Sequence, residues 1–186
     1  MKKLLQWLMR PPVDGPAAAV WVRVMCGSVF LWEGILKFVY LNQGVGRFTK
    51  LGMPFPGATA DFVAVLEIVG GVLLLLGLGT RLIAIPFMIE MIVAMLVTKI
   101  SMFLGTSPLP LPPSPPQIGF WAVLHEVRSE FAQLLTVLFL FIAGPGRISL
   151  DALLARRSMA KSSAVDLEQA SPAIGHRIRN ERLVTH

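Results

Sequence analysis

The sequence predicts an all-α, polytopic membrane protein: a bundle of four transmembrane helices with both termini in the cytoplasm. Composition is the first reason, because 54% of the residues are hydrophobic and only 15% are charged, whereas soluble domains carry about 25% charged residues. The second reason is four long apolar stretches, each about the 20 residues that a helix needs to cross a bilayer. The third is an uneven distribution of basic residues between the two sides.

The four spans are predicted at residues 17–41, 58–79, 82–104 and 120–143. Helix-breaking loops separate them. The first loop holds four glycines and two prolines, and the third, residues 105–119, holds six prolines and predicts an extended connector. Together with the turn that follows the last span, these elements form one membrane domain, residues 17–155.

Both ends of the chain are predicted to lie on the cytoplasmic side. Residues 1–16 combine two lysines with leucines and a tryptophan, which favours a segment lying on the membrane surface. After the last span, Ser149 is expected to cap a short helix, residues 150–156. Residues 156–186 are polar and basic, which predicts a disordered cytoplasmic tail.

The orientation follows from the positive-inside rule. The side of the two termini carries most of the basic residues, while the opposite loops hold only Arg47 and Lys50. We therefore expect a multi-pass protein of the cell inner (plasma) membrane. The net charge of +6 is explained by this bias, so nucleic acid is not expected as a partner, and the lipid bilayer is.

Glu67 is the residue that most needs an explanation. It is the only ionisable residue in the 18-residue apolar run 62–79, and a charge inside a membrane helix costs a few kcal/mol. At about 100° per residue, Glu67 shares a helical face with Ala64 and Gly71. A face of small and charged residues belongs inside a bundle rather than against lipid.

The other spans also carry charges, and most of them fall in the predicted outer half of the bundle. In the third span, Glu90 and Lys99 are nine residues apart and point in opposite directions, so either each has a different neighbour or one of them extends to the membrane surface. Glu90 lies deeper, and Arg23 lies towards the inner side. The candidate catalytic residues are Glu67 and Glu33. The candidate substrate-binding residues are Arg23, Lys37, Glu90, Lys99, Glu126, Arg128 and Glu130.

Two interpretations of these charges stay open. They could form a salt-bridge network that only holds the bundle together. They could also line a polar pocket, open to the outer face, that binds a polar head group or relays protons. The pocket is favoured because a purely structural membrane core needs no charges.

Few resident cofactors fit the composition. The single cysteine, Cys26, allows no disulfide and is expected to be a packing residue. A haem held by two histidines would need a second one beside His125, and the sequence predicts no metal site. Motifs of soluble hydrolases and nucleotide-binding enzymes are missing. No covalently bound cofactor is expected.

Several short motifs together carry a family resemblance. They are Arg23…Gly27…Gly34-x-x-Lys37, Leu51-Gly-Met-Pro54, Glu67-x-x-Gly70-Gly71, Gly77-Leu-Gly-Thr80-Arg81 and Gly144-Pro-Gly-Arg147-x-Ser149-Leu-Asp151. In this order and spacing the chain resembles the DoxX family of membrane proteins over residues 17–155. The resemblance implies a four-helix membrane bundle. Relatives include a subunit associated with thiosulfate:quinone oxidoreductase and terminal quinol oxidase activity, and others are linked to thiol redox balance.

The resemblance leads to a functional expectation. The protein is expected to be a subunit of a quinone-linked oxidoreductase or of a thiol or sulfur redox system, with a membrane quinone as ligand and a redox subunit as partner. The family's catalytic residues are not settled, so the candidate residues rest on the intramembrane charges alone. The alternative is a non-enzymatic scaffold or assembly protein, or a small-solute carrier. The sequence does not fix the oligomeric state.

Overall fold

The computed structural model describes residues 7–8 and 15–162, which form helices and connecting turns without a β-strand. The helices are α2 (Ala19–Val39), α3 (Val45–Lys50), α4 (Pro56–Leu76), α5 (Thr80–Leu104), α6 (Phe120–Glu126) and α7 (Arg128–Ala143). Residues 150–162 form a further helical segment. The all-α prediction is confirmed for this part of the chain.

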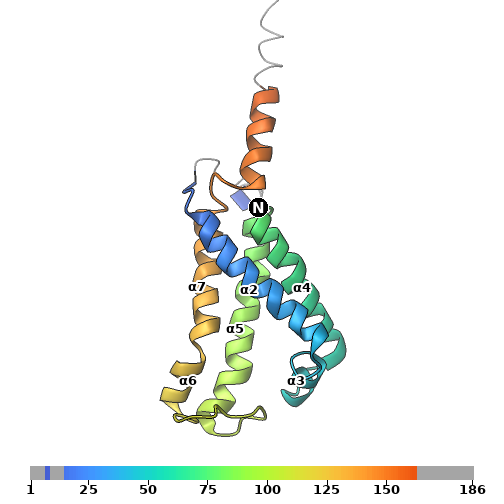
Figure 1. Cartoon of the computed structure of the whole chain (residues 1–186), viewed down its shortest axis with the longest axis vertical. Coiled ribbons are helices and arrows are strands. Elements are labelled where there is room, and N and C mark those ends of the chain that lie inside the picture. Colours follow the sequence, from blue (N-terminus) through green and yellow to red (C-terminus); the bar gives the residue numbers. More distant parts are fainter. Residues whose placement is uncertain (1–6, 9–14, 163–186) are drawn as a thin grey trace, which may run out of the picture.

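Two helix pairs make up the bundle. Helix α2 packs along α4, and α5 packs along α7. The pairs meet at the end where α4 turns into α5 and separate towards the end that holds α3, α6 and the connector 105–119 (Figure 1). We call the first the inner end and the second the outer end.

Three helices of the described residues are long and apolar enough to cross a membrane: α2, α4 and α5. The predicted fourth span is divided at Val127 into α6 and α7. Backbone hydrogen bonds continue on both sides of the break, from Val127 N–H to Val123 O and from Phe131 N–H to Val127 O, each 2.8 Å. The break lies within the most polar part of this stretch, residues 125–130.

Small residues let α2 and α4 approach closely. A Cβ atom on Gly27 would lie 2.8 Å from the Gly71 carbonyl oxygen, and one on Gly71 would lie 2.8 Å from the Gly27 carbonyl oxygen. Distances this short are not found for real side chains, so both positions require glycine. The predicted faces of small residues on the first two spans therefore meet each other.

The apolar core lies between the pairs, towards the inner end. Phe30 of α2 stacks on Phe87 of α5, with ring centroids 3.7 Å apart and an interplanar angle of 4°. Gly70 of α4 lies directly against the Phe87 ring. Cys26 is fully buried in the same cluster, which confirms its predicted packing role.

Hydrogen bonds from two arginines close the inner end. Arg81 donates to the last carbonyls of α7, Phe141 O at 3.1 Å and Ile142 O at 3.0 Å, and to Trp7 O at 2.8 Å. Its guanidinium also lies 3.8 Å from the centre of a Trp7 ring, a cation–π contact. Arg23 donates to Pro145 O at 2.8 Å. Both arginines are buried, so they satisfy carbonyls that water cannot reach.

The turn after α7 adds to this closure. Asp151 accepts hydrogen bonds from the Gly79 and Thr80 N–H groups at 3.0 and 3.4 Å, and so caps α5. Ser149 Oγ accepts from Ala152 N–H at 3.1 Å, which confirms the predicted cap. The helix that it begins continues to residue 162, past its predicted end at 156. The rest of the predicted tail, and most of the predicted interfacial segment 1–16, lie outside the described residues.

Candidate functional site

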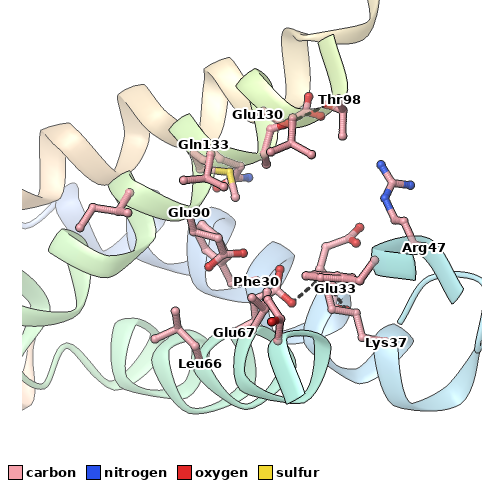
Figure 2. Close-up of a pocket in the computed structure, with 18 of the residues that line it drawn as sticks. Phe30, Glu33, Lys37, Arg47, Leu66, Glu67, Glu90, Thr98, Glu130 and Gln133 are labelled. Carbon is pink, nitrogen blue, oxygen red and sulfur yellow. Dashed lines mark hydrogen bonds and ion pairs between the residues drawn. The ribbon is translucent and has the colours of Figure 1, made fainter. Parts of the chain in front are cut away.

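A cavity of about 700 Å³ lies between the two helix pairs in the outer half of the bundle (Figure 2). Helices α2, α3, α4, α5 and α7 all contribute to its walls. Most of the lining is apolar, with a small number of charged and amide side chains among it. This composition is typical of sites that bind small organic molecules.

The centre of the polar lining is an ion pair between Lys37 of α2 and Glu67 of α4. Lys37 Nζ lies 2.6 Å from Glu67 Oε2, and the side chains are 12% and 4% exposed. Gly34 makes the pair possible, because a Cβ atom there would lie 2.7 Å from the Ala64 carbonyl oxygen and 2.9 Å from Glu67 Cβ. The small-residue packing of α2 and α4 thus places the two charges together.

A second carboxyl group faces the first. Glu90 of α5 lies beside Glu67 (Figure 2), so two acids share the neighbourhood of one lysine. Glu90 Oε2 is buried and has no hydrogen-bond partner among the described residues, and the same is true of Gln133 Oε1 on α7. Buried polar atoms are nearly always paired. These two atoms border the cavity, so a ligand there could satisfy them.

Further charges surround the outer part of the cavity. Glu33 is exposed on α2, one helical turn before Lys37, and Arg47 of α3 also lines the cavity (Figure 2). On the other wall, Glu130 of α7 pairs with Lys99 of α5 at 2.9 Å. Glu90 and Lys99 thus have different neighbours, one of the two outcomes predicted from their spacing.

The structure brings together part of the predicted set. Five predicted residues line the cavity: Glu33, Lys37, Glu67, Glu90 and Glu130. Lys99 contributes indirectly, through its pair with Glu130.

The other three predicted binding residues lie outside the cavity. Arg23 is at the inner end, bonded to the backbone. Arg128 is exposed, with its guanidinium 3.0 Å from the ring of His125, and Glu126 lies 4.0 Å from the same ring. Arg128 lies about 200° around the helix from Glu130, two residues later, so it faces away from the cavity.

Sequence reasoning did not select Arg47, Thr98 or Gln133, which line the cavity. For Gln133 a signal existed, because it follows Glu130 by three residues and so shares its helical face. Arg47 gave no signal, since its predicted loop forms α3 and folds against α4.

Comparison with known proteins identifies the family. The DoxX family profile matches residues 18–100. The "Uncharacterized membrane protein Rv3486" of Mycobacterium tuberculosis is 41% identical over 153 residues, which cover 79% of this chain and 87% of that protein. The chain belongs to the DoxX family. No solved structure matches it.

A second relative carries a functional name. The "Putative oxidoreductase CatD" of Bacillus subtilis is 31% identical over 87 residues, which cover 46% of this chain and 63% of that protein. The DoxX profile match contains α2, α3, α4 and most of α5. Lys37, Glu67 and Glu90 fall within it, whereas Gln133 and Glu130 lie beyond it.

Proposed function

We propose that this DoxX protein is a membrane component of a quinone-linked oxidoreductase, and that the cavity accepts the head group of the quinone. One observation carries the proposal: an apolar cavity holds a lysine–glutamate pair beside a second acid, with two buried polar atoms that lack a partner. A quinone ring is flat and apolar, with two carbonyl oxygens, and fits this combination. The name of the CatD relative adds support.

Quinone reduction to the quinol takes up two electrons and two protons, and the bound quinone is the electron acceptor. The Lys37 ammonium can donate a hydrogen bond to a carbonyl oxygen. Glu67 and Glu90 face each other and can hold a proton between them and deliver it, as general acids do. Gln133 can orient the ring by a hydrogen bond. The two electrons would come from a thiol or sulfur donor, or from a partner redox subunit, and the second proton from water at the edge of the cavity that holds the exposed Glu33.

The proposal includes four spans that cross the bacterial inner membrane, with both termini on its cytoplasmic side. Helices α6 and α7 with Val127 comprise residues 120–143, about 36 Å of helix at about 1.5 Å per residue, enough to cross the hydrocarbon core. Basic residues dominate at the inner end, as the positive-inside rule requires of the cytoplasmic side. The cavity then opens on the outer half of the membrane.

The alternative of a solute carrier is less well supported by the geometry. A carrier needs a path that opens to both sides in turn. Here the inner end is closed by Arg23, Arg81 and Asp151, which are bonded to backbone groups of four segments. Opening the inner end would require breaking these hydrogen bonds together, so the geometry supports binding better than passage. No feature of the described residues specifically favours a scaffold.

The test is quinone reduction in membranes that contain or lack the protein, with thiosulfate and with a dithiol supplied separately as electron donors. Glu67→Gln keeps the shape of the side chain but removes its ability to take up and release a proton. We expect the protein-dependent rate to fall by about 100-fold or more, as is usual for loss of a general acid. The matched control is Asp61→Asn, an exposed carboxyl on the same helix that does not line the cavity.

The control variant should keep its rate within about twofold, as surface substitutions usually have small effects. If the wild-type membranes reduce quinone no faster than membranes without the protein, with either donor, the proposed activity is wrong. Equal rates for wild type and Glu67→Gln would remove Glu67 from the reaction.

A further inference from the structure

The seam between α4 and α5 is closed only in its inner half. There Gly70 lies against Phe87, and a Cβ atom on Gly70 would lie 2.8 Å from Ile83 Cγ1. Towards the outer end the two helices separate (Figure 1). The cavity begins where this contact ends, so beyond it α4 and α5 form two facing walls, with the Glu67 and Glu90 side chains meeting between them.

The side chains of these walls also reach the outside of the bundle. Phe62 of α4 and Ile89 and Val93 of α5 line the cavity, and they are 67%, 58% and 41% exposed. A residue that lines a cavity and is also exposed marks an opening. The cavity therefore reaches the lateral surface of the protein between these two helices.

This opening lies at the depth of the lipid chains. Both helices are candidate membrane spans. Phe62 is six residues into α4 and Val93 is eleven residues from the end of α5, which place them about 9 Å and about 16 Å from the outer helix ends. What meets this opening is hydrocarbon rather than water.

The seam on the other side of the cavity differs in chemistry. There α2 and α7 contribute Glu33, Ser129 and Glu130 to the lining, and the first two are exposed. The cavity thus has a polar side between α2 and α7 and an apolar side between α4 and α5, with the Lys37–Glu67 pair and Glu90 between them. A ligand that matches both sides has a polar head and an apolar chain.

We propose that the ligand enters laterally from the bilayer through the α4–α5 seam, and that its apolar chain stays in the seam between Phe62, Ile89 and Val93 while its head group lies against Lys37, Glu67 and Glu90. The inference rests on the proposed quinone site and makes it more specific. The substrate is a lipid-soluble quinone with a chain, and the seam recognises the chain independently of the ring.

The test compares decyl-ubiquinone with the same ring without its decyl chain. Binding of each is measured by calorimetry to the full chain in lipid nanodiscs, with empty nanodiscs as the blank. Val93→Trp adds bulk to the seam. Ile92→Trp is the matched control, since Ile92 is the adjacent residue of α5, is 45% exposed and does not line the cavity. Phe62→Trp fills the seam from the opposite wall and provides an independent variant.

We expect Val93→Trp to weaken the binding of decyl-ubiquinone about tenfold or more, because the added bulk occupies the space of the decyl chain. Binding of the ring without its chain should weaken by less than about twofold. Ile92→Trp should bind both like the wild type. Lateral binding of the chain would be overturned if Val93→Trp and Phe62→Trp weakened the binding of both probes equally, or of neither. The proposed quinone site would still stand. A wild-type protein that binds neither probe would overturn the proposed function and this inference with it.

Discussion

Removing the charge of Lys37 should destabilise the protein more than removing both charges of its ion pair. Lys37 Nζ and Glu67 Oε2 are 2.6 Å apart, and at an effective dielectric constant of about 20 their attraction is about 6 kcal/mol. Desolvation offsets much of this gain. Lys37→Met keeps the length of the side chain but leaves the Glu67 carboxylate buried without its counter-ion, which costs about 3–5 kcal/mol.

The double variant Lys37→Met/Glu67→Gln removes the orphaned charge as well. We expect its free energy of unfolding to lie within about 2 kcal/mol of that of the wild type, because replacing a whole buried ion pair is often nearly neutral. Glu67→Gln alone should cost less than Lys37→Met alone, since the Lys37 side chain is 12% exposed and Glu67 only 4%. A lysine can extend its ammonium group towards water.

The assay is a double-mutant cycle on the free energy of unfolding, followed by circular dichroism as sodium dodecyl sulfate is added to dodecylmaltoside micelles. The four proteins give a coupling energy that we expect to be a few kcal/mol. If Lys37→Met unfolds at the same detergent fraction as the double variant, the carboxylate is not held by this lysine. The burial argument for Glu67 would then be wrong.

Two other predictions concern the packing and the inner end. Gly71→Ala should lower stability by about 1–3 kcal/mol, because its Cβ atom would lie 2.8 Å from Gly27 O and from Leu31 N, and backbone cannot yield as a side chain does. The control is Gly57→Ala in the same helix, whose Cβ atom would meet nothing closer than 4.0 Å. This variant should be neutral or slightly stabilising. Similar thermal unfolding of the two variants would contradict the close approach of α2 and α4. Asp151→Ala should lower the free energy of unfolding by about 0.5–2 kcal/mol, because it removes the cap of α5. Quinone binding should stay unchanged in the same calorimetric assay. A large loss of binding would mean that Asp151 takes part in the site.

The sequence predicted those features that depend on helical periodicity within one segment. The burial of Glu67 and its glycine-lined face follows from counting residues around a helix, and so do the opposite directions of Glu90 and Lys99. The cap at Ser149 follows from local backbone chemistry. Each of these needs no knowledge of which helix lies beside which.

Features that depend on the pairing of helices could not be derived in this way. That Glu67 pairs with Lys37 rather than Lys99 is decided by Gly34 and Gly71, which draw α2 onto α4. Arg128 was expected in the pocket because of its depth, but the sequence does not show which side of its helix packs along α5 and faces the cavity. Arg47 reaches the site because the loop folds back, a long-range contact without a local signal.

The motifs on which the resemblance to the DoxX family was predicted divide between the two ends of the bundle, and this bears on where the chemistry of the protein lies. Arg23, Arg81 and Asp151 form hydrogen bonds to backbone groups at the inner end. These side chains hold the helix ends together. Lys37 and Glu67 face a cavity whose width depends on the angle between the helix pairs. That angle is set at the inner end, by the arginine bonds and by the stack of aromatic rings in the core. Variants of Arg81 or of the Phe30–Phe87 stack should therefore act on the site through its shape, whereas variants of the Lys37–Glu67 pair act on the charge that a ligand meets.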